Sequence, residues 1–207
     1  MKILIIQTAF IGDVILATAL IEKIHQHHPS YQIDFLLAKG NEKLLEIHPF
    51  INKMLIFDKS TNKFRNLVRL IHHVRRAQYS YVINVHRYFS SGLITACSKA
   101  KFKIGFRKNP LSFLFTTKVD HPINMMLPVH EIDRNQLLIK DITDSISAKP
   151  KLYPSDSDYK NTGNSEAYVC IAPASVWFTK QLPIGKWIEL INSLAAGLKI
   201  YLIGSEQ

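Results

Sequence analysis

A loop that follows the first apolar run of the chain contains the first candidate catalytic residue. The loop reads QTAFIGD and follows the segment Lys2–Ile6, which is expected to be a buried strand. Ligands of open α/β sheets bind at the carboxyl ends of such strands. Asp13, at the end of the loop, could act there as a general base, kept ionised by the positive end of the helix that begins at Gly12. The alternative is that Asp13 is only a capping or first-turn residue.

A second loop offers two hydroxyl groups and one cation to an anion. It reads PASVWFTKQLP and follows the apolar segment Tyr168–Ala172. Phosphate groups bind at such strand ends, where hydroxyls, an ammonium group and the N-terminus of a following helix converge. Ser175, Thr179 and Lys180 are therefore candidate phosphate-binding residues. An ordinary surface loop is the alternative interpretation.

Positive charge is concentrated in one part of the chain. The formal net charge is +10, and the stretch Lys59–Lys118 holds 13 of the 26 Lys and Arg residues and no acidic residue. The positive electrostatic field of such a stretch favours an anionic partner, such as a phosphorylated substrate, an anionic lipid or a nucleic acid. The stretch has no recognisable nucleic-acid-binding motif, so we do not expect a nucleic acid as partner. A plain solvated face is the alternative.

Four residues of this basic stretch are candidates for binding the anionic partner. Arg65 and Arg69 share the basic side of an expected amphipathic helix. His86 and Arg87 follow the fourth expected strand, at the same carboxyl edge of the sheet as Asp13. The alternative for His86 and Arg87 is a surface ion pair or a helix cap.

Other kinds of site are not indicated. The loop after the first strand is neither a GxGxxG nor a Walker A loop, which argues against a dinucleotide or P-loop site. No HExxH or Cys/His spacing occurs, so we expect no metal and no cofactor. Two cysteines, Cys97 and Cys170, fit thiols in a reducing cytosol. No apolar run reaches the ~18 residues that a membrane span needs.

The composition and the order of elements predict an α/β fold. Of 207 residues, 47% are hydrophobic and 20% are charged, which is typical of a globular protein with a sizeable core. Apolar runs alternate with amphipathic segments, so we expect a Rossmann-like, mainly parallel sheet. Strands are expected over residues 2–6, 33–37, 53–57, 81–85, 102–106, 168–172 and 199–203, and helices from Gly12 to about His28 and over 61–78, 89–98, 130–146 and 184–196. In the helix over 61–78, the expected core stripe is Phe64, Leu67, Val68, Ile71 and Val74.

Two domains are expected from the same pattern. Residues 1–148 form the first Rossmann-like domain, and residues 149–166, rich in Pro, Gly, Ser, Asp and Asn, form a linker. Residues 167–207 begin a second Rossmann-like domain, which buries too little to be stable alone. We therefore expect this part to dock on the first domain, or the chain to be truncated.

Four segments resemble the lipopolysaccharide heptosyltransferase family, in the family's order. MKILIIQTAFIGDVILATALIEKI is similar to the family's first strand and the helix that opens with I-G-D. VINVHRYFSSGLITACSKAKFKIGFRK is similar to its strand, helix and I-G-F segment, and HEIDRNQLL to its H-x-x-x-R helix start. YVCIAPASVWFTKQLPIGKWIELINSL is similar to the segment that opens its second domain. Together the matches run across essentially the whole chain.

The resemblance implies a GT-B fold and an inverting, metal-independent glycosyltransferase at the inner face of the cell membrane, in the cytoplasm. A heptose-like sugar would pass from a nucleotide-diphosphate donor to an acidic lipopolysaccharide-core or related surface-glycan acceptor. Asp13 would activate the acceptor hydroxyl, and the loop containing Ser175, Thr179 and Lys180 would contact the donor diphosphate across the cleft between the domains. The basic stretch would face the anionic glycolipid acceptor.

A function of a different class stays open beside this one. The basic stretch alone would also fit a non-catalytic module that binds anions or a membrane surface on a degenerate Rossmann-like scaffold. The family's remaining donor-binding loops would lie beyond Gln207, so we expect the 207-residue chain to be inactive alone.

Overall fold

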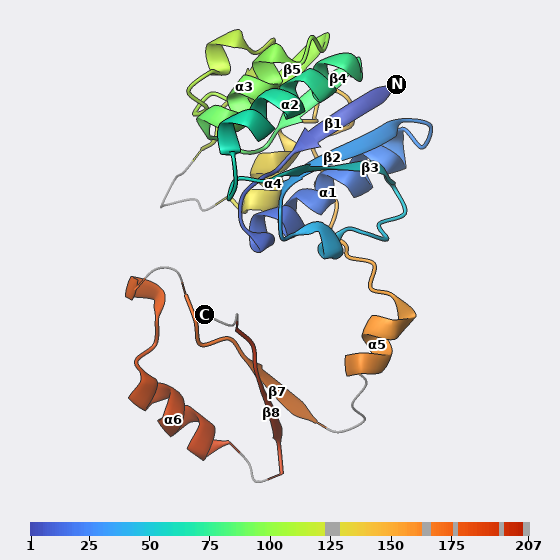
Figure 1. Cartoon of the computed structure of the whole chain (residues 1–207). Helices are drawn as coiled ribbons and strands as arrows, with labels where there is room; N and C mark the ends of the chain where they lie inside the picture. Colours follow the sequence, from blue (N-terminus) through green and yellow to red (C-terminus); the bar gives the residue numbers. More distant parts are fainter. Residues whose placement is uncertain (123–128, 163–166, 176–177, 195–196, 205–207) are drawn as a thin grey trace. The chain divides into compact units, whose positions relative to one another are not determined.

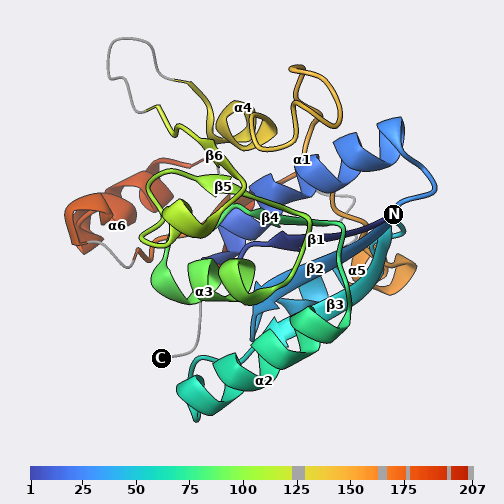
Figure 2. The same cartoon turned by 90° about the horizontal axis from the view of Figure 1, so that it is seen from above.

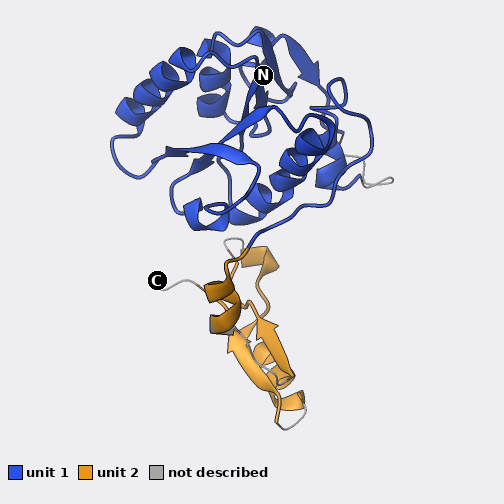
Figure 3. Ribbon diagram, turned by 90° about the vertical axis from the view of Figure 1, so that its right-hand side faces the viewer, with its two compact units in different colours: residues 1–153 blue, residues 154–207 orange. Residues whose placement is uncertain are grey.

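The computed structural model describes residues 1–122, 129–162, 167–175, 178–194 and 197–204. The chain forms two compact units, Met1–Tyr153 and Pro154–Gln207 (Figure 3). The division into domains at residues 148 and 166 stays a prediction.

The first unit is built on a six-stranded, fully parallel sheet with the strand order β3-β2-β1-β4-β5-β6 (Figure 1). The predicted α/β class with a Rossmann-like parallel sheet is confirmed. The strands are β1 Lys2–Ile6, β2 Gln32–Ala38, β3 Ile51–Phe57, β4 Tyr81–Asn84, β5 Phe102–Phe106 and β6 Thr117–Val119. The helices are α1 Ile11–His27, α2 Lys63–Arg76, α3 Phe89–Cys97 and α4 Glu131–Gln136, with short 3₁₀ helices at Glu42–Leu44 and Ser112–Leu114.

Helices cover both faces of this sheet: α1 and α4 lie on one face, and α2 and α3 on the other (Figure 2). Successive strand side chains point to opposite faces, so a central strand covered on both sides must be apolar throughout. In β1, Ile3 and Ile5 pack with the core under α1, whereas Leu4 and Ile6 pack with the core under α2 and α3. This double burial explains the uninterrupted apolar run at the start of the chain.

The strand order reverses between β1 and β4, which creates a topological switch point. From β1 the chain passes through α1 to β2 on one side, and from β4 it passes through α3 to β5 on the other. The two loops therefore diverge onto opposite faces of the sheet. Ligands of open α/β sheets bind in the crevice outside such a point.

Helix α2 buries a narrower stripe than the sequence predicts. Leu67, Leu70 and Val74 are its buried residues. The prediction was wrong for Phe64, which is 78% exposed, and for Val68, which is 37% exposed. Because α2 packs against α3 and the edge strand β3, the surface that it covers is too narrow for the wider stripe.

The helix expected over residues 130–146 ends much earlier, since α4 stops at Gln136. Beyond it the backbone continues in tight turns, and the Gln136 side chain donates to Thr143 Oγ1 at 3.1 Å and to the Asp144 carbonyl at 2.7 Å. Leu138 and Ile139 are still buried, so the apolar positions reach the core without a regular helix.

The second unit contains one parallel βαβ arrangement. Strands β7 Tyr168–Ile171 and β8 Lys199–Leu202 pair in parallel, and α6 Ile184–Ser193 connects them. These elements lie where the sequence predicts them. A helix that the sequence does not predict, α5 Asp156–Thr162, lies within the expected linker.

Candidate functional site

Asp13 lies in the first turn of α1, directly beyond the carboxyl end of β1. Its side chain is partly exposed. Phe10 occupies the N-cap position and no side chain there makes a capping hydrogen bond, so Asp13 is not a hydrogen-bonding cap. Among the residues that the structure describes, Asp13 has no hydrogen-bond or ion-pair partner. Its carboxylate is therefore available to accept a proton.

The loop that leads to Asp13 is held by the neighbouring strand ends. The Ala9 amide donates to the side-chain oxygen of Gln7 at 3.3 Å, and Asn41 Nδ2 donates to the Ala9 carbonyl at 3.4 Å. Lys59 Nζ donates to the carbonyl of Thr8. Asn41 follows β2 and Lys59 follows β3, so two further strand ends fix the backbone on which α1 begins.

A hydrogen bond spans the switch point between the loops that follow β1 and β4. Thr8 Oγ1 lies 2.9 Å from His86 Nδ1, and both residues are buried. Burial, together with the nearby positive charges of Lys59 and Arg87, lowers the pKa of His86 to about 4. The imidazole is therefore uncharged at neutral pH. Burial, together with Lys63, also lowers the pKa of Lys59.

The loop after β4 is held by hydrogen bonds to two of its own backbone carbonyl groups. The Ser91 hydroxyl lies 2.7 Å from the His86 carbonyl and 2.8 Å from the Tyr88 carbonyl. Asn109 Nδ2 donates to the same two carbonyls, at 3.3 and 3.0 Å. Gly92 is required here, because a Cβ at this position would lie 2.2 Å from Asn109 Oδ1. Arg87 lies between His86 and Tyr88, whose carbonyls accept these hydrogen bonds, and its side chain is exposed.

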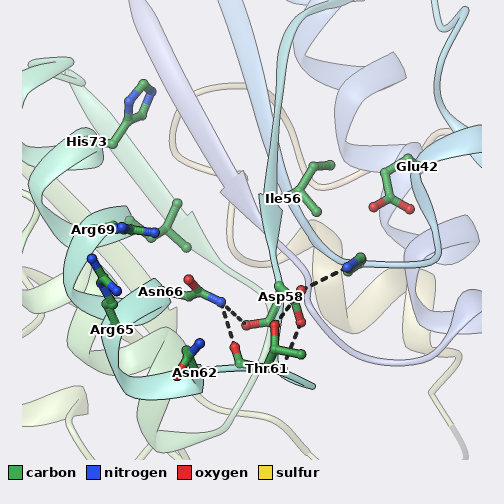
Figure 4. Close-up of a pocket in the computed structure, with 11 residues that line it drawn as sticks. Glu42, Ile56, Asp58, Thr61, Asn62, Arg65, Asn66, Arg69 and His73 are labelled. Atoms are coloured by element: carbon green, nitrogen blue, oxygen red, sulfur yellow. Dashed lines mark hydrogen bonds and ion pairs between the residues drawn. The ribbon is translucent and has the colours of Figure 1, made fainter.

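Arg65 and Arg69 lie in a different place, on the side of α2 that lines a surface groove of about 700 Å³ (Figure 4). Neither arginine has a hydrogen-bond or ion-pair partner among the described residues. Asp58, across the groove, accepts hydrogen bonds from Ser60 and Lys39, and these hold the pKa of its carboxyl well below its usual range. The structure thus brings Asp13, His86 and Arg87 to the switch point and places Arg65 and Arg69 apart from them.

The candidate phosphate-binding residues lie in the second unit, after β7. Thr179 and Lys180 belong to the 3₁₀ helix Phe178–Lys180 and are exposed. The loop is closed by Gln181, whose Nε2 donates to the Ser175 carbonyl at 2.7 Å. Among the described residues Lys180 has no hydrogen-bond or ion-pair partner. The roles of these three candidates stay predictions.

The described parts of the chain offer neither a metal site nor a membrane-spanning helix. No group of three or more His, Cys, Asp or Glu side chains in them could hold a metal ion. No helix in them is long and apolar enough to cross a bilayer. That no metal or cofactor is needed stays a prediction.

Three residues that shape the site were not predicted from the sequence: Thr8, Lys59 and Asn109. Thr8 and Lys59 each stand within two residues of a strand's carboxyl end, which is the one pattern that could have drawn attention to them. Asn109 lies in the turn after β5, and nothing in its surroundings along the chain predicts its contacts.

The chain matches known proteins over most of its length. Residues 67–207 match the family model described as glycosyltransferase family 9 (heptosyltransferase). The chain is 26% identical over 197 residues to the lipopolysaccharide core heptosyltransferase OpsX of Haemophilus influenzae, covering 91% of this chain and 55% of that protein. It is 27% identical over 199 residues to lipopolysaccharide heptosyltransferase 3 of Escherichia coli, covering 88% and 57%. The chain thus spans little more than half the length of these curated relatives.

Solved structures share the fold. A glycosyl transferase of family 9 from Veillonella parvula superposes with a TM-score of 0.82 at 16% identity, over 99% of this chain and 62% of that one. E. coli ADP-heptose lps heptosyltransferase II gives a TM-score of 0.77 at 19% identity, over 99% and 65%. E. coli heptosyltransferase WaaC, solved with ADP, gives 0.74 at 17% identity, over 100% and 69%. The predicted GT-B fold class is thereby confirmed.

Proposed function

Because the chain belongs to glycosyltransferase family 9, the heptosyltransferase family, we propose that it serves an inverting sugar transfer. A heptose-like sugar passes from a nucleotide-diphosphate donor to an acidic lipopolysaccharide-core or related surface-glycan acceptor. The observation that carries this proposal is the carboxylate of Asp13, which lies at the switch point of the sheet and has no partner among the described residues. The proposal concerns the complete polypeptide in which these 207 residues occur.

Asp13 acts as the general base of the transfer. Its carboxylate accepts the proton of the acceptor hydroxyl while that oxygen forms a bond to the anomeric carbon of the donor sugar. The bond between this carbon and the diphosphate breaks on the opposite face, so the configuration inverts. The carboxylate lies in the first turn of α1, at the positive end of the helix dipole.

Ser175, Thr179 and Lys180 stabilise the leaving diphosphate. As the bond to the sugar breaks, negative charge grows on the diphosphate oxygens, and preorganised donors are most effective against such developing charge. Lys180 supplies a cation without a partner among the described residues, and Thr179 supplies an exposed hydroxyl. We propose that neither a metal nor another cofactor takes part.

The anionic acceptor contacts Arg87 and His86 at the switch point and Arg65 and Arg69 in the groove beside α2. The guanidinium groups of these arginines, which have no ion-pair partner in the part of the chain that the structure describes, can form bidentate hydrogen bonds with carboxylates and phosphates. An acceptor carried on a glycolipid also requires contact with the anionic inner surface of the cell membrane, which the same cations favour. The protein is accordingly proposed to be cytoplasmic and peripheral.

The test is a transfer assay with the complete polypeptide, ADP-heptose and heptose-deficient lipopolysaccharide. Release of ADP together with a glycolipid heavier by one heptose supports the proposal. A folded protein that binds the lipopolysaccharide but transfers no sugar from ADP-heptose, or from other nucleotide sugars, refutes it. That result would favour the non-catalytic anion-binding module instead.

A further inference from the structure

The carboxyl edge of the first unit exposes an unusual group of large apolar side chains. Phe10 is 68% exposed and Ile11 57%, in the segment that leads from β1 into α1. Tyr88 is 68% exposed and Phe89 56%, where the loop after β4 enters α3. These two pairs flank the switch point from opposite faces of the sheet. Large apolar groups that gather on the surface at such a switch point are a mark of a binding site.

Tyr88 differs from an ordinary exposed aromatic residue because its backbone is held in place. Its carbonyl lies 2.8 Å from the Ser91 hydroxyl and 3.0 Å from Asn109 Nδ2. Gly92 allows Asn109 to approach this closely. The ring is thus presented to solvent from a fixed loop, so little conformational entropy remains to be lost when a ligand packs on it.

The surroundings of the Tyr88 ring combine an apolar face with polar groups. The ring centroid lies 4.6 Å from that of His86, whose Nδ1 is joined to Thr8 in the loop leading to Asp13. The Tyr88 hydroxyl has no hydrogen-bond partner among the described residues, and the adjacent Arg87 side chain is exposed. A sugar ring has the matching chemistry: an apolar face of C–H groups with a rim of hydroxyls and, in an acidic sugar, a carboxylate.

We infer that Tyr88 is the platform on which a ring of the acceptor glycan packs, with Arg87 beside it to bind the acidic group of that sugar. This inference rests on the proposed function and specifies which part of the acceptor lies next to Asp13. A sugar fits the site better than a lipid surface, because a membrane-inserting patch would not need a loop that is fixed by hydrogen bonds. Tyr88 is therefore a specificity-determining residue for the acceptor and does not take part in the proton transfer.

The test measures binding of a deacylated, heptose-deficient lipopolysaccharide oligosaccharide to the 207-residue chain by calorimetry. Tyr88→Ala should raise Kd about tenfold, which corresponds to about 1.4 kcal/mol. Tyr88→Phe should stay within about threefold of wild type, because it keeps the ring face. Phe113→Ala is the matched control, since Phe113 is 66% exposed but lies in the 3₁₀ helix Ser112–Leu114, and it should leave Kd unchanged.

Three outcomes separate the possibilities. A wild-type chain that binds the oligosaccharide equally well after Tyr88→Ala overturns the platform and leaves the proposed function standing. A wild-type chain that ignores the oligosaccharide but binds anionic vesicles through Tyr88 overturns the platform and assigns these side chains to a lipid surface. If Tyr88→Ala unfolds the chain, Tyr88→Leu replaces it, and an unchanged Kd for Tyr88→Leu overturns the requirement for a flat ring.

In the complete polypeptide, Tyr88→Ala should raise the KM for acceptor and leave the KM for donor unchanged.

Discussion

Asp13→Asn separates the two roles that an acidic residue at the start of α1 can have. The substitution keeps the shape of the side chain and removes its charge and its ability to accept a proton. A hydrogen-bonding cap is worth about 0.5–2 kcal/mol of stability. Asp13 makes no such bond, so only its interaction with the helix dipole is lost, about 0.3–1 kcal/mol. For a chain of this size the melting temperature should fall by about 1–4 °C.

The effect on sugar transfer should be much larger than the effect on stability. Removing a general base slows a reaction by about 10²–10⁴-fold. The assay follows heptose transfer to heptose-deficient lipopolysaccharide by the complete polypeptide at saturating donor and acceptor. Thermal unfolding of the same preparation is measured in parallel, so that a loss of folded protein is not mistaken for a loss of turnover.

Asp156→Asn provides the matched control for Asp13→Asn. Asp156 is also an exposed acid in the first turn of a helix, α5, and the same chemical change there should alter neither turnover nor, beyond the dipole interaction, stability. The assignment of Asp13 as the base would be refuted by turnover of Asp13→Asn within a few-fold of wild type. It would also be refuted if Asp13→Asn and Asp156→Asn reduced turnover equally.

Three further predictions concern stability and charge. The pKa of His86 is about 4 in the folded chain against 6.5 for the free side chain, so below pH 6.5 the unfolded chain binds a proton that the folded chain does not. The contribution of His86 to the free energy of unfolding is therefore fully present above pH 6.5, and about 3 kcal/mol of it should be lost as the pH drops to 4. Urea unfolding at pH 7.5 and 4.5 should show this loss in wild type and a smaller one in His86→Gln. Asp34 is fully buried, pairs with Lys2 Nζ at 3.3 Å and accepts a 2.6 Å hydrogen bond from Tyr79, so Asp34→Ala should lower the free energy of unfolding by about 3–5 kcal/mol in the same assay. Reversing Arg65 and Arg69 to Glu should weaken binding to anionic vesicles and reduce its salt dependence in co-sedimentation at two ionic strengths; salt-insensitive, unchanged binding would leave α2 as a solvated face.

The sequence predicts the central strands well because burial on both faces leaves an unambiguous pattern. In β1 and β2 almost every residue is buried, and both strands are found within one residue of the predicted bounds. Strand β6 was not predicted, since its three residues Thr117–Val119 contain no apolar run. It forms because the edge of β5 offers a ladder of backbone groups, which is a property of the assembled sheet.

The apolar stripe of α2 shows a different limit. A helical period predicts which side chains share a face, but not how wide a surface the rest of the protein presents to that face. Leu67 and Val74 were predicted correctly, whereas Leu70 is buried in place of Phe64 and Val68. The width of that surface depends on how α3 and the edge strand β3 pack against α2, and the sequence of α2 does not specify this packing.

Part of the candidate site could also be predicted from the sequence, and part could not. That Asp13, His86 and Arg87 share the carboxyl edge follows from the rule that parallel strands end at one edge. The contact between Thr8 and His86 requires in addition that β1 and β4 be neighbours, and 78 residues separate the two partners. Nothing local specifies that adjacency, so the hydrogen bond that joins the two loops could not be predicted.

The strand order also determines what kind of anion the basic stretch can serve. Arg87 follows β4, and the groove lined by Arg65 and Arg69 lies beside β3, with β1 and β2 between them. Neighbouring strands lie about 4.8 Å apart, so β4 and β3, beside which the two sets of cations lie, are three spacings, about 14 Å, apart. A single phosphate or carboxylate cannot bridge that distance, whereas an extended acidic glycan of a few sugar units can. The number of positive charges alone is compatible with any anion. The strand order places these charges apart and therefore favours an extended anion over a small one.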